Sequence, residues 1–417
     1  MPALQNSATD RLHQCRTCLA PDPFLYLPLG DHAPAQMLIR PEDLDKEQPA
    51  FGLNTQVCLS CGLVQVADQI PADFFRHYLY VPSGAATMHT HFEGLAKRLF
   101  DIAGPGRLIV DIGCNDGLML AAANALGART LGVDPAANIA ELANKRGVAV
   151  HVDYFNAKTA ETLRGGHDRP KIIATSNTFN HIGDLHAFMK AIDIFLAEDG
   201  LFVIEVPRAK EMIENALFEN MYHEHVSQFS LLSIAKLGAH FDMHIVDVDR
   251  LPAIHGGSMR VFLGRKASRV SPKAVVAEML TEEADAGMLD RQRYVDLVKR
   301  VDAIGAEIRK ILDDFKAQGK KIAGYGASAR GNTLIAYYGI GANYLDFLVD
   351  KNPLKQGLYS PNLRLPIKPV EAIETERPDV LFVLAWNFFD EIQGQQQAFL
   401  ARGGKFVAPL PVPRIVG

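Results

Sequence analysis

The chain has 417 residues, of which 48% are hydrophobic and 22% are charged, and its formal net charge is −5 at pH 7. This length predicts two or three domains, and the composition is that of a globular protein. The charge gives no overall case for nucleic-acid binding, and no apolar run approaches the ~20 residues of a membrane helix. The N-terminus lacks the basic start and apolar core of a signal peptide, so a cytoplasmic location is expected.

Four of the five cysteines form two C-x-x-C pairs. The first pair is Cys15 and Cys18, and the second is Cys58 and Cys61. Two such pairs can place four thiolates around one zinc ion in tetrahedral geometry. Disulfides are not expected in a reducing compartment, and one redox C-x-x-C motif would not explain the second pair. Because all four ligands would be thiolates, we expect the zinc to be structural.

An aromatic segment, residues 74–84 (FFRHYLYVPSG), follows the cysteine pairs. Tyr78 and Tyr80 are two positions apart, so their side chains point to the same side if the segment is extended. They would then face a cleft, with Leu79 packed behind them. The alternative is that the segment only anchors a linker by hydrophobic contact. An amphipathic helix is predicted next, over residues 88–102.

Residues 107–117 (RLIVDIGCNDG) predict the centre of the next domain. The first half reads as a buried parallel strand that ends in Asp111, and Gly113 and Gly117 allow a tight turn. An alanine-rich helix is predicted over 118–126. The turn lacks the full G-x-G-x-x-G pattern of a pyrophosphate binder. It resembles the S-adenosylmethionine (SAM) loop of class I methyltransferases, although an ordinary strand-turn-helix would also fit.

The strand predicted over 130–133 ends in Asp134, an acidic group placed to accept hydrogen bonds from ribose hydroxyls. Further strands over 148–152, 171–175 and 201–206 alternate with helices, which implies a parallel doubly wound sheet. Ligands of such sheets bind at the carboxyl ends of the strands.

Polar side chains stand at these strand ends. Asp153 is expected to meet the adenine amino group, and His181, in the stretch NTFNH, is expected near the methyl donor. Glu205 ends a further strand. The expected cofactor-binding residues are Asp111, Gly113, Asn115, Asp134, Asp153 and Asn177.

Residues 219–230 (ENMYHEHVSQFS) contain several polar side chains close together in the sequence. Their H-E-H sequence does not match the helical H-E-x-x-H metal motif. A carboxylate can orient an imidazole and fix its tautomer, so Tyr222, Glu224 and His225 suit a general-base cluster. A solvated loop with incidental histidines is the alternative, and the sequence assigns no role to His223.

The C-terminal part begins with a turn predicted over 252–260 (PAIHGGSMR), followed by a long helical scaffold over 271–318. Residues 320–332 (KKIAGYGASARGN) then predict a second strand, glycine turn and helix. Gly324-x-Gly326-x-x-Ala329 matches a loose dinucleotide fingerprint. Backbone N–H groups at such a helix start can bind a diphosphate. The remaining predicted strands cover 345–349, 380–384 and 405–408, and Asp350 follows the first of them.

In this order the motifs resemble those of the zinc-containing, SAM-dependent sugar C-methyltransferases, which include the 3-C-methyltransferases of deoxysugar biosynthesis. The resemblance runs from Cys15 to about Pro413. It implies an α/β fold with an N-terminal zinc-binding module (1–78), a central Rossmann-like class I SAM methyltransferase domain (79–250) and a C-terminal Rossmann-like nucleotide-binding domain (251–417). It also implies SAM and structural Zn²⁺ as cofactors.

The substrate that the resemblance implies is a nucleotide-linked 4-keto-6-deoxy sugar, commonly linked to thymidine diphosphate. It places the base at His225 with Glu224 beside it, and Tyr78, His181 and Tyr222 around the reacting centre. The base would remove the proton α to the ketone, and the enolate carbon would then attack the SAM methyl group. The expected substrate-binding residues are His255, Gly256, Arg260, Tyr325, Gly326, Ser328 and Asn332.

Three other functions would each fit a part of the sequence. A nicotinamide-dependent oxidoreductase would use the Gly324 turn, but it would leave the SAM-like loop at 111–115 without a purpose. A zinc-ribbon nucleic-acid binder predicts a basic face near the cysteines, whereas residues 41–47 are mostly acidic. O- or N-methylation of another small metabolite is the nearest competitor. The sequence does not give the sugar, the methylated carbon or the oligomeric state.

Overall fold

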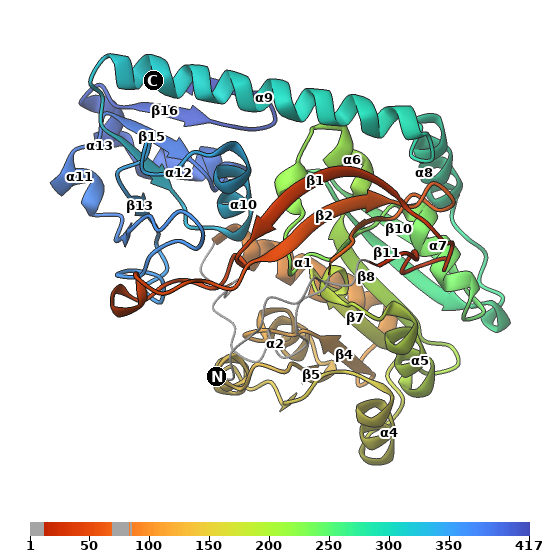
Figure 1. Ribbon diagram of the computed structural model, residues 1–417. Helices are drawn as coiled ribbons and strands as arrows, with labels where there is room; N and C mark the ends of the chain where they lie inside the picture. Colours follow the sequence, from red (N-terminus) through yellow and green to blue (C-terminus); the bar gives the residue numbers. More distant parts are fainter. Residues whose placement is uncertain (1–11, 69–82, 84–85) are drawn as a thin grey trace.

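Three β-sheets organise the protein (Figure 1). The computed structural model describes residues 12–68, 83 and 86–417. In that part of the chain the sheets have four, seven and six strands. Within the same ranges, no helix combines the length and the apolar character that a membrane span requires.

The N-terminal sheet is antiparallel and takes its last strand from the middle of the chain. Its strands, in order across the sheet, are β1 (Phe24–His32), β2 (Phe51–Val57), β3 (Val64–Val66) and β9 (Ser227–Gln228). In the β3–β9 pair, Val64 lies opposite Gln228. The N–H of Val66 also donates to the carbonyl of Val226 at 3.0 Å. Hydrogen bonds therefore join this sheet to the segment that contains His225.

The four paired cysteines lie together beside β2 and β3. Their sulfur atoms all lie within 4.8 Å of one another. Cys15 and Cys61 are 3.5 Å apart at sulfur, and so are Cys18 and Cys58. A tetrahedral thiolate site with Zn–S bonds of about 2.3 Å would space its sulfurs about 3.8 Å apart. Both the donor set and the spacing fit one structural zinc ion.

Arg16 connects this cysteine cluster to the rest of the fold. It is only 7% exposed, and it stands between the two cysteines of the first pair. Its Nη1 atom donates to the carbonyl of Val66 at 2.7 Å and to that of Val226 at 3.1 Å. One guanidinium therefore holds together β3 and the residue that follows His225.

The middle sheet is the largest, and its strand order is β10-β11-β8-β7-β4-β5-β6. Its strands are β4 (Leu108–Ile112), β5 (Arg129–Val133), β6 (Val150–His151), β7 (Ile172–Ser176), β8 (Leu201–Pro207), β10 (Met243–Leu251) and β11 (Ser258–Arg265). The strands β4 to β8 are parallel, whereas β11 is antiparallel to both β8 and β10. The order reverses between β4 and β7, and ligands of doubly wound sheets bind at this point.

Helices cover both faces of this sheet, which explains why its strands are almost continuously apolar. They are α1 (Ala86–Ala103), α2 (Leu118–Ala125), α3 (Ala137–Lys145), α4 (Ala157–Gly166), α5 (Leu185–Phe195) and α7 (Leu231–Ala239). The short helix α6 (Ala209–Glu214) follows β8 and belongs to a separate core, which it shares with the N-terminal and C-terminal sheets. In β4, Ile109 belongs to the core formed with α1 and α2. Its neighbours Leu108 and Val110 belong to the core on the opposite face, with α4, α5 and α7.

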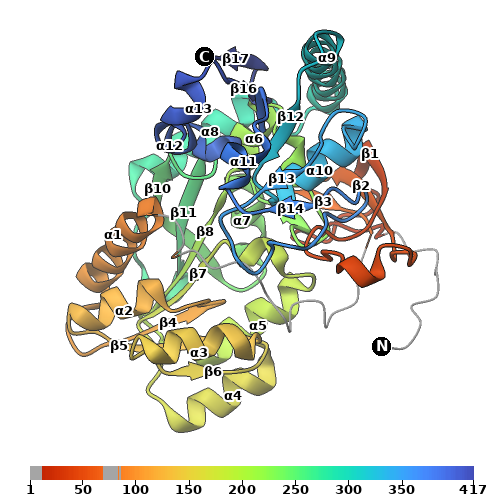
Figure 2. The same ribbon diagram turned by 90° about the vertical axis from the view of Figure 1, so that its left-hand side faces the viewer.

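The C-terminal sheet is a second doubly wound unit, with the order β14-β13-β12-β15-β16-β17. Its strands are β12 (Ile322–Tyr325), β13 (Leu348–Val349), β14 (Ile367–Lys368), β15 (Val380–Val383), β16 (Lys405–Ala408) and β17 (Arg414–Val416), of which only β17 is antiparallel. The helices of this part are α10 (Ala329–Tyr338), α11 (Ala372–Glu376), α12 (Phe389–Gln395) and α13 (Gln397–Ala401). Figure 2 shows the N-terminal sheet beside α10 and β14, where Ile39 and Tyr359 form a β-bridge.

A long helix, α9 (Arg291–Ala317), runs along one side of the molecule (Figure 1). It begins next to α8 (Ala274–Asp285) and extends to the C-terminal sheet. Near its start, the Tyr294 ring lies 5.1 Å from the Tyr26 ring of β1. Further along, Gly305 faces Tyr338 of α10, whose ring leaves no room for a Cβ atom. This helix therefore packs against both the N-terminal and the C-terminal parts.

Several predicted elements differ from the structure. The helical region predicted over 271–318 is present and consists of two helices, which are separated where Gly287 has a positive φ of 69° and Asp290 caps the start of α9. The turn at 252–260 is shorter than predicted, since β10 and β11 flank it and carry the middle sheet past residue 250. The helix α4 and the strand β14 were not predicted. Short 3-10 helices occur at η1 (Pro41–Asp43), η4 (Phe179–His181), η5 (Phe218–Asn220), η6 (Lys266–Ser268) and η7 (Trp386–Phe388).

Replacing Cys58 with serine tests the structural role of the cysteine cluster. Because zinc coordination stabilises only the folded state, Cys58→Ser should lose most of its zinc and unfold at a lower temperature. Metal analysis of the purified protein should give about one zinc per chain for the native sequence and well below half of that for the variant. Cys114→Ser, at a buried cysteine outside the cluster, is the control and should keep its zinc. Full zinc content in Cys58→Ser would contradict the assignment.

Candidate functional site

A cavity of about 1770 Å³ opens among the three parts of the chain. Gln36 of the N-terminal part, Asp134 of the middle part and Ser328 of the C-terminal part all line it. Sites for one small ligand usually measure about 300–1,000 Å³. The cavity can therefore hold two ligands of moderate size at once.

All six expected cofactor-binding residues line one end of this cavity, at the carboxyl ends of β4, β5, β6 and β7. Asp134 is held firmly there. Its carboxylate accepts the N–H of Asn115 at 3.0 Å and the N–H of Ala136 at 2.9 Å. Burial raises the pKa of Asp134, and these two N–H groups partly offset that effect. The carboxylate keeps lone pairs on the cavity side for the hydroxyls of a ribose.

Asp111 is a buried carboxyl group with unused hydrogen-bonding capacity. Its Oδ1 atom has no partner among the described residues. Burial raises the pKa of Asp111 well above its ordinary value, and the negative charges of Asp134 and Glu205 raise it further. A cationic ligand would relieve this accumulation of negative charge. SAM carries a sulfonium and an ammonium group, so its chemistry fits this end of the cavity.

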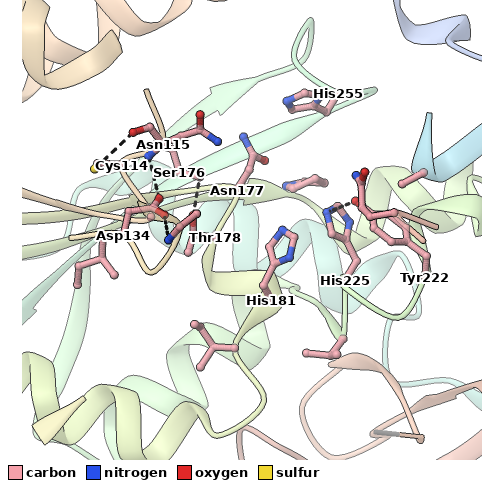
Figure 3. A pocket seen from close by; sticks show the side chains of 18 of the residues that line it. Cys114, Asn115, Asp134, Ser176, Asn177, Thr178, His181, Tyr222, His225 and His255 are labelled. Atoms are coloured by element: carbon pink, nitrogen blue, oxygen red, sulfur yellow. Dashed lines mark hydrogen bonds between the residues drawn. The ribbon is translucent and has the colours of Figure 1, made fainter. Parts of the chain in front are cut away.

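The centre of the cavity holds a cluster of aromatic and imidazole rings (Figure 3). The hydroxyl of Tyr222 lies 2.5 Å from Nε2 of His225, and the two rings stack with their centres 4.0 Å apart. The edge of His181 meets His225 at a ring distance of 4.8 Å. Figure 3 shows Asp134 and Asn115 on one side of His181, and Tyr222 and His225 on the other. The rings therefore lie next to the cofactor end.

These histidines are neutral at neutral pH. Burial lowers the pKa of His181 to about 4 and that of His255 to about 4. Burial also lowers the pKa of His225 well below 6.5, and the nearby cation of Arg330 lowers it further. A neutral His225 has a lone pair to accept a proton, but a lowered pKa makes it a weak base. Proton removal from a ketone here requires strong stabilisation of the product anion.

Glu224 does not orient His225, contrary to the prediction from their adjacency. The structure gives it no hydrogen bond to that ring, and it is absent from the cavity lining among the described residues. Burial raises its pKa to about 8, and Lys355 and the backbone of Gln36 partly offset this. The ring of His225 is instead held by Tyr222 and by a backbone hydrogen bond with Asn220.

Three expected substrate-binding residues lie outside the lining of the large cavity. Arg260 is buried in β11, where it forms ion pairs with Glu205 at 2.7 Å and Asp249 at 3.1 Å. Gly256 faces Leu217 and Trp386, not the cavity. Asn332 is only 3% exposed, and its Nδ2 donates to the carbonyl of Ala35. These three residues act within the protein and are not placed to touch a ligand in this cavity.

Other expected residues do meet at the cavity. The lining includes His255, Tyr325, Gly326 and Ser328. Tyr78 lies outside the described residues.

Two polar groups near the site were missed by the sequence analysis. His91 of α1 lies 2.5 Å from the Glu205 carboxylate, and a histidine on an amphipathic helix gave no signal. Although burial acts to raise the pKa of Glu205, His91 and Arg260 together hold it below its ordinary value. Arg330 lines the cavity directly after the glycine turn. In the sequence, its position at the start of the predicted helix after the glycine turn was the only indication that Arg330 would reach a binding site.

The turn at Gly326 repeats the geometry of the turn at Gly113. The N–H of Gly113 donates to Val133 at 2.7 Å, and the N–H of Gly326 donates to Val349 at 2.7 Å. Both glycines have positive φ angles.

The acidic residue at the end of the neighbouring strand is also repeated. The Asp350 carboxylate accepts the N–H groups of Ala327 and Asn352, each at 2.8 Å. Asp134 makes the same pair of bonds at the other end of the cavity, and both aspartates line it. The C-terminal sheet thus repeats the local hydrogen-bond arrangement of the turn at Gly113.

Three known protein families match the chain. Residues 15–75 match a family described as a zinc binding domain, residues 85–248 match a methyltransferase domain, and residues 253–411 match a C-methyltransferase C-terminal domain. The C-methyltransferase NovU of Streptomyces niveus is 35% identical over 408 residues, which is 97% of each protein.

Two more distant matches cover less than half of the chain. A ubiquinone biosynthesis O-methyltransferase of Chelativorans sp. (strain BNC1) is 31% identical over 28% of this chain and 47% of its own length. The solved structure of a magnesium protoporphyrin IX methyltransferase from Synechocystis PCC 6803 covers 42% of this chain and 83% of its own. Its sequence identity is 12% and its TM-score is 0.35.

Replacing Asp134 with asparagine should weaken SAM binding about 10- to 100-fold. The variant loses the charge that strengthens hydrogen bonds to the ribose hydroxyls, but the amide oxygen can still accept one backbone N–H. Calorimetric titration with SAM measures the change, and the unfolding temperature should fall little. Asp45→Asn, at an exposed position away from the cavity, is the matched control. An unchanged affinity in Asp134→Asn would show that the ribose binds elsewhere.

Replacing Glu224 with glutamine should stabilise the protein increasingly as pH rises. The pKa of Glu224 in the folded state is about 8, above its ordinary value of 4.5. Between these two pH values the carboxyl group is therefore protonated in the folded state but ionised in the unfolded state. The native chain therefore loses stability as pH rises through this window, and Glu224→Gln does not. The difference in unfolding free energy should grow from near zero at pH 4.5 to on the order of 3 kcal/mol at pH 7.5. Urea unfolding at both pH values measures it.

The exposed variant Glu47→Gln is the control and should show no such dependence on pH. A constant difference between Glu224→Gln and the native chain would mean that Glu224 is ionised in the folded state.

Proposed function

Because the chain belongs to the family of SAM-dependent C-methyltransferases, we propose that it methylates a nucleotide-linked 4-keto-deoxysugar at the carbon α to the ketone. The chemical reason is the position of the imidazole cluster. A carbon α to a ketone is methylated only after a proton leaves it to generate a nucleophile, and His181 and His225 are neutral rings next to the cofactor end. The ketone makes that proton removable.

The observation that carries this proposal is the single cavity shared by three features. The SAM-type loop at Gly113, the Tyr222–His225 pair and the glycine turn at Gly326 all line it. A methyl donor at one end and a nucleotide at the other would place the substrate's sugar between them, beside the rings. Holding both reactants in contact removes much of the entropic cost of their encounter.

The C-terminal end of the cavity suits an anionic nucleotide. Ser328 caps α10 by accepting the N–H of Gly331, and the start of this helix offers further N–H groups to a diphosphate. Lys351 and Lys355 line the same end. Asp350 is held as Asp134 is, which supports a hydrogen bond to the hydroxyl of a second nucleoside. Thymidine diphosphate is the nucleotide that the family resemblance implies.

In the proposed reaction, His225 takes the proton from the α carbon, and the C–H electron pair forms the enolate. The enolate carbon then attacks the methyl group that SAM supplies, the S–CH₃ bond breaks toward sulfur, and the ketone is restored. The Tyr222 hydroxyl now contacts Nε2 of His225, so this contact must open when the substrate binds. The same hydroxyl would then donate to the enolate oxygen.

Mass spectrometry of reaction mixtures tests the substrate. The purified protein is incubated with SAM and a panel of nucleotide sugars, half with a 4-keto group and half with a 4-hydroxyl group. The expected result is a gain of one CH₂ on carbon in the keto sugars alone. Methylation on oxygen or nitrogen, or no reaction with any keto sugar, would overturn the proposal.

Replacing His225 with asparagine tests the base. Asparagine keeps some hydrogen bonding but cannot accept the proton, so turnover should fall roughly 10²–10⁴-fold, the usual range for a general base. The direct measurement is exchange of the substrate's α hydrogen with deuterated water in the absence of SAM. Tyr222→Phe, which frees Nε2 of His225, should retain more exchange than His225→Asn. If His225→Asn exchanges at the native rate, another group is the base.

A further inference from the structure

Arg330 occupies a place in the cavity that the reaction described so far does not use. It is the second residue of α10, and it lines the cavity between the glycine turn and the rings. Its Nη2 atom lies 2.5 Å from the carboxylate of Glu219. Its guanidinium also stacks over the Trp386 ring, 4.9 Å from the centre. The guanidinium is therefore held by Glu219, from the segment after β8, and by Trp386, from the C-terminal part.

The anchor is itself rigid. Glu219 is fully buried in η5, and it also accepts the indole N–H of Trp386 at 3.2 Å. Arg330, Glu219 and Trp386 thus form a closed triangle of contacts. A charged group fixed before the reaction stabilises a transition state without the cost of reorganisation.

Arg330 keeps donors for a ligand. A guanidinium has five N–H groups, and the hydrogen bonds of Arg330 within the described residues go to Glu219 alone. Its Nε atom has no acceptor among those residues. The side chain is 13% exposed, although Glu219 is closed off from solvent. Nε is itself buried, so the donors that can reach a ligand are those of Nη1, which makes no hydrogen bond within the described residues.

The charge of Arg330 acts at the rings. It contributes to the lowered pKa of His225 and to that of His255, so it lies within electrostatic range of both. Lys355, another cation of the cavity, acts instead on Glu224. Arg330 is always charged at working pH, unlike the two histidines. It is therefore a permanent cation close to the point where the proposed reaction creates a negative charge.

We propose that Arg330 binds the oxygen of the substrate's ketone and stabilises the enolate that forms when His225 removes the α proton. This inference rests on the proposed function. The C–H pair moves into the new C=C bond, the carbonyl π pair moves to oxygen, and an Arg330 N–H donates to that oxygen. When the carbon attacks the methyl group, the pair returns to form the ketone and the S–CH₃ pair leaves with sulfur. Arg330 stays protonated throughout.

The requirement for such a group follows from the weakness of the base. A neutral imidazole with a lowered pKa is a weak base. The enolate, which is the other product of the proton transfer, must therefore be stabilised by another group. A preorganised donor at a developing oxyanion contributes about 10²–10³-fold in rate. Arg330 is thereby distinguished from Lys351 and Lys355, which line the nucleotide end.

The experiment compares Arg330→Gln and Arg330→Lys with the native chain. Deuterium exchange at the substrate's α carbon, measured at saturating substrate without SAM, should fall about 10²–10³-fold in Arg330→Gln and less in Arg330→Lys. The affinity for thymidine diphosphate, measured by calorimetry, should change less than about 3-fold. Unchanged SAM binding shows that both variants are folded. Arg291→Gln, an exposed arginine of α9 away from the cavity, is the matched control.

The outcomes separate the possible roles. A loss of affinity for thymidine diphosphate, with normal exchange at saturation, would make Arg330 a diphosphate anchor and overturn the inference. Native exchange and native affinity in Arg330→Gln would overturn it as well. If the native chain itself shows no exchange on any nucleotide 4-keto sugar, the proposed function fails, which is a different result.

Discussion

The cysteine cluster and the segment that carries His225 are joined by the two hydrogen bonds that Arg16 gives to the carbonyls of Val66 and Val226. Burial lowers the pKa of Arg16 to about 10, so the side chain is still charged at neutral pH. A buried charge is costly unless it is paired and hydrogen-bonded. The two carbonyls accept from Nη1 at the point where β3 meets β9, and the negative charge of Cys15 partly offsets the effect of burial on the pKa of Arg16. Arg16 therefore connects the cysteine cluster to the residue that follows His225.

The two ends of the cavity carry different charged residues. Its cofactor end carries Asp111, Asp134 and Asp153, whereas the end at the C-terminal sheet carries Lys351 and Lys355 together with Asp350. Under the proposed function, a methyl donor with two cationic groups and a nucleotide with a diphosphate would have opposite preferences between these ends. Electrostatic discrimination would then act against the wrong arrangement as much as for the right one. The neutral histidines lie between the two ends, where the proposed reaction would create charge.

Features encoded within short segments were predictable from the sequence. The family, the α/β fold class, the zinc-binding module and SAM as cofactor are confirmed, because each depends on spacing within a few residues or on motif order. The error over Glu224 arose because neighbours in the chain need not point the same way. The turn brings Tyr222, three residues earlier, onto the His225 ring instead.

Features that depend on pairing between distant segments were not predictable. Arg260 was expected to bind substrate, but β11 pairs with β8 so that Arg260 lies directly opposite Glu205. No pattern within either segment shows that register. The triangle of Arg330, Glu219 and Trp386 likewise joins three separate parts of the chain. The roles given to the individual site residues stay proposals.

The repeated turn at Gly113 and Gly326 has a consequence for how a two-substrate enzyme can arise. Each turn, with its aspartate at the end of the neighbouring strand, is built within one sheet and takes none of these hydrogen bonds from the other sheet. Under the proposed function, two such turns facing one cavity would bind two ligands without a new binding architecture. The features specific to the proposed reaction would then be confined mainly to the segment 219–230. Selection for a different acceptor could reshape one receptor while the donor side stays unaltered.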